Sequence, residues 1–277
     1  METSNLKIIA LQYAPVLKNV KASMEIVNNL INQYSEKDQI DVLLLPELSF
    51  VGSSFYGYYD ILPFAEQQGN GKSYHWCVEV SKKLKCIVII GYPEICGDIL
   101  YNSMLVVSES GQILKNYRKR QLFSLEWDWA LPGNEFAYLD AKVWRIHKTV
   151  RFGLGICNDI WYNTPQQQYQ MDWARFLDEN DCQVILMHSN WPDYKLYENN
   201  DIKTQVMMIY WLNRLVPVTQ SSKKSKNIYF INANRIGEEL GTEYIGSSCF
   251  FTLQPQITIE NNLECNNQGS LICKLQI

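Results

Sequence analysis

Three reactive side chains stand where apolar, strand-like runs of the sequence end. Glu47 follows a Leu-Leu-Leu-Pro run, Lys119 follows Asn-Tyr-Arg, and Cys157 closes an apolar run that contains two glycines. In open α/β sheets, ligands bind at the carboxyl ends of the strands, where the following loops converge on one cleft. We therefore expect Glu47, Lys119 and Cys157 to meet at one site.

These three residue types together predict a nucleophilic hydrolase. A free thiol has a pKa of about 8.5, and an adjacent cation such as Lys119 favours the thiolate. The same cation stabilises the oxyanion of a tetrahedral intermediate. Glu47, flanked by leucines, is expected to be desolvated enough to act as a general base. It would take the thiol proton, return it to leaving ammonia, and then activate water against the thioester. With ammonia as the leaving group, the bond attacked would be a carbon–nitrogen bond, in particular that of a primary amide.

Each residue taken alone also has a purely structural explanation. A cysteine that closes an apolar strand commonly packs in the core. A glutamate after Leu-Pro is typical of a loop or helix start, and a lysine after Tyr-Arg is typical of a solvated strand end. The prediction rests on Glu47, Lys119 and Cys157 occurring together and in these contexts.

Short β-branched runs alternate with amphipathic stretches along the chain, which predicts an α/β fold with a mixed sheet. A turn-forming Ser-Glu-Ser-Gly cluster at 108–111 predicts an antiparallel hairpin over 100–118. We find no linker or repeat, so residues 1–277 are expected to form one domain, with 260–269 as a loop before a last short strand. The expected strands are 7–11, 41–45, 86–91, 103–107, 151–157, 183–187, 228–232 and 248–253, and the expected helices are 19–34, 73–84, 165–179 and 201–215.

Composition narrows the classes of function. The 277 residues are 47% hydrophobic and 19% charged, with a net charge of −4. A slightly acidic, soluble, folded protein is expected, and no basic stripe predicts a nucleic acid partner. No signal peptide or membrane span is apparent. The eight cysteines form no CxxC pair and the three histidines are scattered, so we expect neither a metal site nor disulfides, and a reducing compartment. The cytoplasm is the expected location, with the mitochondrion left open.

The contexts of the three residues resemble those of the nitrilase superfamily of carbon–nitrogen hydrolases. The resemblance covers almost the whole chain and rests on ordered motifs. These are Leu-Pro-Glu-Leu-Ser-Phe-Val-Gly at 45–52, Asn-Tyr-Arg-Lys-Arg-Gln-Leu at 116–122, Gly-Leu-Gly-Ile-Cys-Asn-Asp at 153–159, Gly-Tyr-Pro-Glu at 91–94, Tyr-Asn-Ser at 101–103, Asn-Ala-Asn-Arg-Ile-Gly at 232–237 and Gly-Ser-Ser at 246–248.

The resemblance implies a four-layer αββα sandwich, pairing of two subunits sheet to sheet, and no metal or organic cofactor. It implies that Glu47 is the general base, Lys119 the oxyanion stabiliser and Cys157 the acylated nucleophile. Many members have a second glutamate a few residues past the lysine, which orients the substrate and the lysine. Glu126 is the candidate for that position.

Within the superfamily the chain looks most like the branch that deamidates Asn or Gln at the amino terminus of proteins. Many members have a histidine two positions after the lysine, whereas this chain has Gln121, and the segment Asp60-Ile-Leu-Pro63 lies outside the general motifs. Members of that branch are longer than 277 residues. Two alternatives remain: a small-molecule amidase, nitrilase or carbamoylase of the same superfamily, or a non-catalytic binding subunit with this fold.

The expected substrate is the amino terminus of a peptide or protein, and neither a membrane nor a nucleic acid is expected as a partner. Such a substrate requires particular groups in the site. Its α-ammonium requires a carboxylate, for which the loop residues near the motifs are candidates. Aromatic side chains can wall the pocket and contact the cation through their π faces. Asp159 has the alternative role of fixing the backbone around Cys157. The candidate substrate-binding residues are Asp60, Trp127, Asp128, Asp159, Asp193, Asn190 and Trp191, the Asn190-Trp191 pair because it follows the strand 183–187 where the superfamily places pocket residues.

Overall fold

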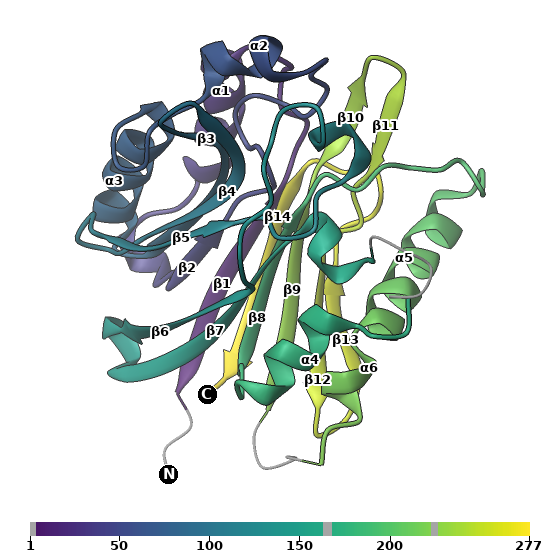
Figure 1. Cartoon of the computed structure of the whole chain (residues 1–277). Coiled ribbons are helices and arrows are strands. Elements are labelled where there is room, and N and C mark those ends of the chain that lie inside the picture. The colour runs from purple at the N-terminus through teal and green to yellow at the C-terminus, as the bar shows by residue number, and fades with distance from the viewer. Residues whose placement is uncertain (1–3, 163–167, 223–226) are drawn as a thin grey trace.

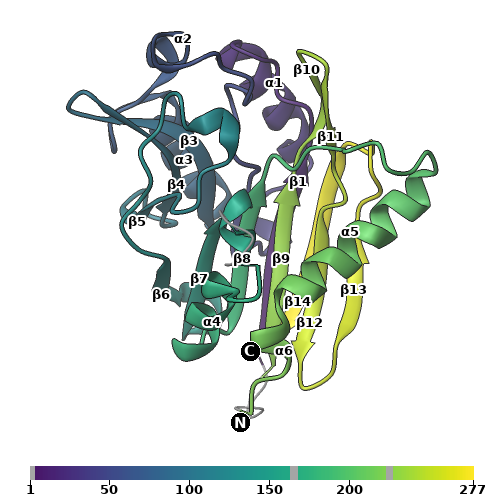
Figure 2. The same cartoon turned by 45° about the vertical axis from the view of Figure 1, so that its right-hand side comes forward.

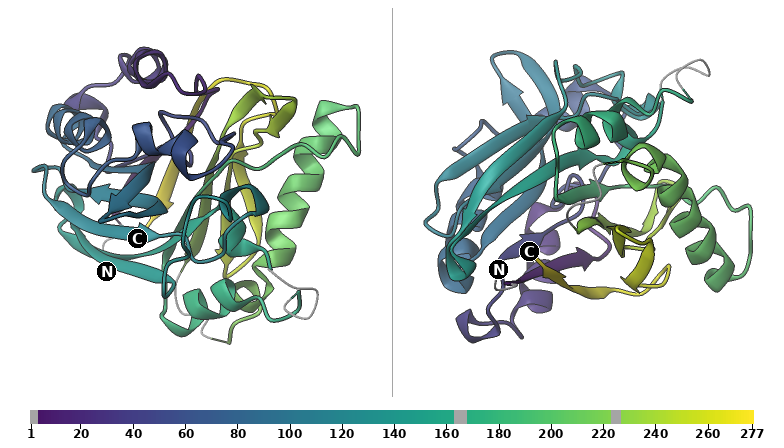
Figure 3. Two further views of the ribbon diagram at one scale, coloured as in Figure 1. Left: turned by 45° about the horizontal axis from the view of Figure 1, so that its top comes forward. Right: turned by 90° about the horizontal axis from the view of Figure 1, so that it is seen from below.

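Two six-stranded sheets lie face to face at the centre of the molecule (Figure 1). The computed structural model describes residues 4–162, 168–222 and 227–277. Helices cover the outer face of each sheet, so the layers run helix, sheet, sheet, helix (Figure 3). The expected four-layer αββα sandwich is confirmed.

The first sheet has the strand order β14-β1-β2-β3-β4-β5. Strands β1, β2 and β3 run parallel, whereas β14 pairs antiparallel with β1 and β4 and β5 continue antiparallel from β3. The sheet is thus mixed, as predicted. Its strands are β1 (Asn5–Gln12), β2 (Val42–Leu44), β3 (Ile87–Cys96), β4 (Ile99–Val107), β5 (Ile113–Arg118) and β14 (Gly269–Gln276).

The second sheet has the order β13-β12-β9-β8-β7-β6, with β7, β8 and β9 parallel to one another. Its strands are β6 (Ala137–Val143), β7 (Lys148–Ile156), β8 (Val184–Ser189), β9 (Ile228–Asn234), β12 (Cys249–Gln254) and β13 (Thr258–Asn262). A separate two-stranded hairpin, β10 (Ile236–Glu239) and β11 (Thr242–Ile245), rises above this sheet (Figure 2).

Helices α1 (Val20–Ile31) and α3 (Lys72–Leu84) cover the first sheet, and α4 (Asp172–Glu179), α5 (Asn200–Arg214) and α6 (Val216–Thr219) cover the second (Figure 2). The helix α2 (Tyr58–Ile61) lies in the loop after β2. Asn19 begins α1, because its side chain accepts a hydrogen bond from the Ala22 amide at 3.1 Å. Single-turn 3-10 helices are η1 (Glu36–Asp38), η2 (Leu62–Phe64), η3 (Ser124–Glu126), η4 (Trp144–Ile146) and η5 (Cys157–Ile160).

Alternation along the strands separates two apolar layers. In β1, Ile8 points to the cluster between the sheets, whereas Ile9 points to the cluster under α1 and α3. From the second sheet, Phe152 and Leu186 are buried in the same intersheet cluster as Ile8. Strands that are buried on both faces explain the nearly continuous apolar runs of the sequence.

The eight predicted strands and the hairpin over 100–118 are present, with ends that differ by a few residues. The expected helix over 165–179 was too long: α4 begins at Asp172, and 163–167 lie outside the described residues. The expected loop over 260–269 was partly wrong, because β13 extends to Asn262 and the last strand is an eight-residue partner of β1. No helix in the described part of the chain is long and apolar enough to cross a bilayer.

Candidate active site

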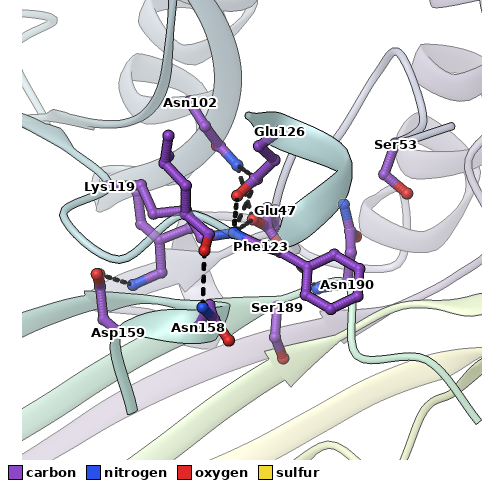
Figure 4. Close-up of polar contacts among 12 residues, drawn as sticks. Glu47, Ser53, Asn102, Lys119, Phe123, Glu126, Asn158, Asp159, Ser189 and Asn190 are labelled. Atoms are coloured by element: carbon purple, nitrogen blue, oxygen red, sulfur yellow. Dashed lines mark hydrogen bonds and ion pairs between the residues drawn. The ribbon is translucent and has the colours of Figure 1, made fainter. Parts of the chain in front are cut away.

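The Glu47 carboxylate lies at the carboxyl end of β2 and is the centre of a buried polar cluster (Figure 4). Only 2% of Glu47 is exposed. Its Oε1 accepts hydrogen bonds from Lys119 Nζ at 2.7 Å and from Asn102 Nδ2 at 2.7 Å. Its Oε2 accepts one from the Asn190 amide at 2.7 Å. Four segments of the chain therefore meet at this carboxylate.

Lys119 is shared between two carboxylates. It directly follows β5, and its Nζ lies 2.7 Å from Glu47 Oε1 and 2.8 Å from Glu126 Oε1. Glu126 belongs to η3, where its Oε2 accepts a hydrogen bond from the Phe123 amide at 2.7 Å. Asn102 Nδ2 donates to Glu126 as well as to Glu47. Two carboxylates and one ammonium leave one formal negative charge in excess within this cluster.

Cys157 begins η5 immediately after β7, with a backbone φ of +43°. A positive φ is uncommon for a residue with a side chain and is characteristic of positions held by their surroundings at functional sites. Gly155 allows the close packing behind this turn, because a Cβ at that position would overlap the Trp173 ring of α4. The nucleophile candidate is thus presented by a constrained turn.

Asp159 holds this turn and does not line the cavity described below. Its Oδ2 accepts hydrogen bonds from the Ile156 amide at 2.8 Å and the Tyr117 hydroxyl at 2.7 Å. Its Oδ1 accepts from the amides of Arg120 at 3.1 Å and Gln121 at 2.9 Å. Of the two roles expected for Asp159, the geometry is that of fixing the backbone around Cys157, and it links β7 to the residues beside Lys119.

The electrostatics differ from the simple expectation of a preformed thiolate. Burial and the charge of Glu47 raise the pKa of the Cys157 thiol well above its ordinary value, and the charge of Lys119 offsets them only in part. Lys119 stays charged, but it is paired with the carboxylates of Glu47 and Glu126. Their negative charges counteract the effect of the lysine on the thiol. The resting thiol is therefore protonated at neutral pH.

The carboxylates have opposite shifts. Burial raises the pKa of Glu47, but the charge and hydrogen bond of Lys119 outweigh burial, and the net pKa lies below its ordinary value. Burial is the largest influence on Glu126 and raises its pKa, and the charge and hydrogen bond of Lys119 do not fully offset burial together with the repulsion from Glu47. Glu47 is thus an ionised base, not the neutral carboxyl that desolvation alone would give.

A cavity of about 530 Å³ opens above Cys157. The charged side chains that line it within the described residues are Glu47, Lys119 and Glu126. Its other walls are mostly aromatic or small polar side chains. They include Trp127, Trp161, Tyr162, Asn190, Trp191, Tyr194, Ser53, Thr242 and Tyr244.

The structure brings together on this cavity seven of the residues singled out from the sequence: Glu47, Lys119, Cys157, Glu126, Trp127, Asn190 and Trp191. The aspartates expected to bind an α-ammonium lie elsewhere. Asp60 pairs with Lys18 at 2.6 Å, and Asp193 pairs with Lys203 at 2.6 Å. Asp128 is likewise not a lining residue. Their ion pairs and positions leave the site without an aspartate.

Sequence reasoning missed several residues of the site. Asn102 bridges both glutamates, and the Tyr-Asn-Ser segment that contains it is one of the motifs shared with the superfamily. The β10–β11 hairpin supplies Thr242 and Tyr244 to the cavity wall. No local pattern marks these contacts, since they join segments far apart in the chain.

His188 was also missed, and it lies behind the base. A Cβ at Gly91 would lie 2.8 Å from both Glu47 Cα and His188 Cε1, so the absence of a side chain at Gly91 lets the two segments meet. Burial lowers the pKa of His188 to about 4, so the ring is neutral. His188 therefore adds no charge to the cluster.

Comparisons with known proteins agree with this geometry. The carbon–nitrogen hydrolase family profile matches residues 7–267. Protein N-terminal amidase of Saccharomyces cerevisiae is 28% identical over 68% of this chain, and the match spans 45% of that protein. Protein N-terminal amidase of Schizosaccharomyces pombe is 26% identical over 98% of this chain and 100% of that protein. The chain thus spans less than half of the first relative and the whole of the second.

Solved structures show the same fold. An N-terminal amidase crystallised with an Asn-Glu peptide superposes with a TM-score of 0.85 at 19% identity, covering 99% of this chain and 98% of that one. An amidase from Nesterenkonia sp. superposes with a TM-score of 0.75 at 17% identity, covering 100% of this chain and 92% of that one.

Proposed function

The chain belongs to the carbon–nitrogen hydrolase family, and from this premise we propose that it deamidates Asn or Gln at the amino terminus of peptides and proteins. The products are the corresponding Asp or Glu terminus and ammonia. The observation that carries the proposal is the buried Glu47–Lys119–Glu126 cluster, which lines one cavity with Cys157. The two N-terminal amidase relatives support the choice of substrate.

In the first half-reaction Cys157 Sγ attacks the carbon of the side-chain carboxamide. Glu47 takes the thiol proton as the carbon–sulfur bond forms, and negative charge moves to the carboxamide oxygen. Lys119 is positioned to stabilise that oxyanion, since its Nζ is held by two carboxylates at the cavity wall. Glu47 then gives the proton to the departing nitrogen, the carbon–nitrogen bond breaks, and ammonia leaves a thioester on Cys157.

In the second half-reaction water takes the place that ammonia has left. Glu47 removes a proton from water, and the oxygen attacks the thioester carbon. Collapse of the tetrahedral intermediate breaks the carbon–sulfur bond, and the proton returns to the thiolate. One water is consumed and one carboxylic acid and one ammonia are formed, which become carboxylate and ammonium at neutral pH, so the base and the thiol end as they began.

The raised pKa of Cys157 fits this cycle. A thiol that stays protonated until a carbonyl is in place does not react with other electrophiles in an empty site. Proton transfer to Glu47 is then coupled to the attack, because the charge that forms on the carboxamide oxygen lies beside Lys119. Glu126 and Asn102 act as positioning residues, since each holds Lys119 or Glu47 in place.

The cavity suits a cationic amino terminus attached to a peptide chain. The excess negative charge of the cluster attracts an α-ammonium. Trp127, Trp161 and Trp191 present aromatic surface on which the ammonium and the first residues of the chain can rest. Trp127 and Tyr194 are 65% and 61% exposed at the same cavity, so the wall continues outward to solvent where the remaining chain must leave.

Pairing of two chains stays a prediction. Helices cover the outer faces of both sheets, so contact between two copies would involve helix surfaces rather than bare sheets (Figure 3). Sedimentation equilibrium would decide this by comparing the measured mass with the 32.3 kDa of one chain.

Ammonia release from a substrate panel tests the proposal. The panel contains peptides that begin with Asn or Gln, their N-acetylated forms, free glutamine, simple aliphatic amides and nitriles. We expect turnover of the free-amine peptides and loss of it in Cys157→Ser. Turnover of free small molecules alone would contradict the proposal and favour the small-molecule alternative. A Cys157→Ala protein that keeps its biological activity would favour a non-catalytic binding role.

A further inference from the structure

Among the described residues that line the cavity, Asn190 is the one whose side-chain polar atoms are buried and have no hydrogen-bond partner, and the proposed mechanism does not use them. Asn190 is 8% exposed and lines the cavity. Neither its Oδ1 nor its Nδ2 makes a hydrogen bond within residues 4–162, 168–222 and 227–277. Its backbone amide, by contrast, is fixed to Glu47 Oε2 at 2.7 Å.

A buried carboxamide without partners destabilises a protein, and such groups are rare in native structures. A leucine has nearly the same shape and would leave no donor or acceptor unpaired. The backbone contact to Glu47 needs no particular side chain. Contacts within the chain therefore do not explain an Asn side chain at this position. A bound ligand that supplies one acceptor and one donor would explain it.

The reacting part of the substrate does not need Asn190. The carboxamide oxygen faces Lys119, and the departing nitrogen and the attacking water exchange protons with Glu47. What remains are the groups that make the substrate an amino terminus: the α-ammonium, which only donates, and the carbonyl of the first peptide bond, which only accepts. In an N-terminal Asn the ammonium nitrogen lies three covalent bonds from the carbon under attack, and the carbonyl oxygen lies four bonds from it. The Asn190 backbone is anchored to Glu47, and Asn190 lines the same cavity as Cys157, so its carboxamide is a candidate partner for these groups.

We propose that Asn190 recognises the amino-terminal end of the substrate, its Oδ1 accepting from the α-ammonium and its Nδ2 donating to the first peptide carbonyl. This inference rests on the proposed function and names the residue that separates a peptide amino terminus from a simple amide. A neutral acceptor suffices because the cavity wall already holds two carboxyl groups, Glu47 and Glu126, against the single ammonium of Lys119. The acidic residues lining the described cavity wall are Glu47 and Glu126, and both are bonded to Lys119.

Aromatic faces complete the proposed ammonium site. Trp191 directly follows Asn190 and lines the cavity, and the Trp161 ring lies 6.0 Å from it at an interplanar angle of 72°. This is a T-shaped contact, and because both tryptophans line the cavity, aromatic surface that attracts a cation lies next to Asn190. The carboxamide of Asn190 provides the hydrogen bond that aromatic surfaces cannot.

The test is a cycle of two enzymes and two substrates. Wild type and Asn190→Leu are each assayed with a peptide that begins with Asn and with its des-amino analogue, in which hydrogen replaces the α-amine. A site built to hydrogen-bond a group rejects analogues that lack it by orders of magnitude. We expect loss of the α-amine to lower kcat/KM of wild type by about 10²-fold or more, and that of Asn190→Leu by less than about tenfold.

The unfolding temperature of Asn190→Leu is the second measurement. If Asn190 had a structural role, the substitution would lower that temperature. Asn190→Leu should unfold at the same temperature as wild type or higher, since it removes two unpaired buried groups. Asn213→Leu, on the exposed face of α5, is the matched control and should keep the wild-type ratio between the two substrates. Release of ammonia from the peptide by wild type tests the proposed function by itself. The comparison with Asn190→Leu is interpreted only when wild type shows this activity. Equal discrimination by wild type and Asn190→Leu, or a large drop in the unfolding temperature of Asn190→Leu, would overturn the inference.

Discussion

The substitution Glu47→Gln should lower turnover by orders of magnitude and at the same time make Cys157 more reactive toward alkylating reagents. The charge of Glu47 is, after burial, the largest influence that raises the pKa of the Cys157 thiol. Glutamine keeps the shape of the side chain and removes that charge. The folded-state pKa of the thiol should therefore fall toward its ordinary value, although the general base is lost.

The magnitudes follow from the contacts of the carboxylate. Loss of a general base costs about 10²–10⁴-fold in kcat/KM. Glutamine must direct its Nε2 either at the Asn190 amide or at Lys119 and Asn102, all of which are donors. One buried donor then lacks a partner, which costs about 1–3 kcal/mol in the free energy of unfolding. Lys119 keeps Glu126 at 2.8 Å, so the larger penalty of a wholly unpaired buried charge does not arise.

The assay is the rate of alkylation of Cys157 by iodoacetamide as a function of pH, read by mass spectrometry of the intact protein. Only the thiolate reacts with iodoacetamide, so the alkylation rate increases as the pH passes the pKa of the thiol. A lower thiol pKa in Glu47→Gln therefore shifts the midpoint of this increase to lower pH. Glu126→Gln is the matched control and should give a smaller shift in the same direction, because Glu126 raises the pKa of Cys157 less than Glu47 does. An unchanged or higher midpoint in Glu47→Gln would refute the electrostatic reasoning.

Three further predictions test other parts of the site. Lys119→Met should lower kcat/KM by at least about 10²–10³-fold. The substitution also leaves two buried carboxylates without their cation, so the free energy of unfolding measured by chemical denaturation should fall by about 3–5 kcal/mol at neutral pH. That loss should shrink as the pH falls, because the carboxylates of the variant become protonated, and a loss independent of pH would contradict the assignment. Asp159→Asn replaces an acceptor of four hydrogen bonds that hold the Cys157 turn, so it should lower both kcat and the unfolding temperature, whereas a normal unfolding temperature would show that the turn does not depend on it. Trp127→Ala, at the exposed edge of the cavity, should raise KM for peptides with little change in kcat, measured against Trp144→Ala, an exposed tryptophan elsewhere; an equal effect of both would exclude a role in binding.

The sequence predicted the parts of this molecule whose pattern is local. Strands β1, β7 and β8 are buried on both faces, and their apolar runs were visible without any partner. Strand β6 was not predicted, because it lies at the edge of its sheet and its buried residues are interrupted by half-buried and exposed ones, which weakens the apolar pattern. The hairpin β10–β11 is short and its burial pattern is irregular, so it too gave no clear signal.

The site was predictable as a set of residues but not as a set of contacts. Glu47, Lys119 and Cys157 were found because each ends a recognisable run. The hydrogen bonds of Asn102 to both glutamates join β4 to the end of β2 and to η3, and no spacing in the sequence encodes that meeting. For the same reason Asp60 seemed as suitable a partner for an α-ammonium as any other carboxylate, until its ion pair with Lys18 placed it outside the cavity wall.

The charges of the site connect substrate recognition to catalysis. Glu47 and Glu126 raise the pKa of Cys157, and Lys119 offsets their effect only in part. An α-ammonium bound at Asn190 would bring a second positive charge to the cavity and would oppose the same effect. The ammonium should therefore favour the loss of the thiol proton as well as hold the substrate in place. A des-amino substrate then loses kcat in addition to binding, whereas a purely positioning role for the ammonium would appear in KM alone. Separate determination of kcat and KM with the two substrates distinguishes these cases, and an effect confined to KM would show that the thiol does not sense the charge of the amino terminus.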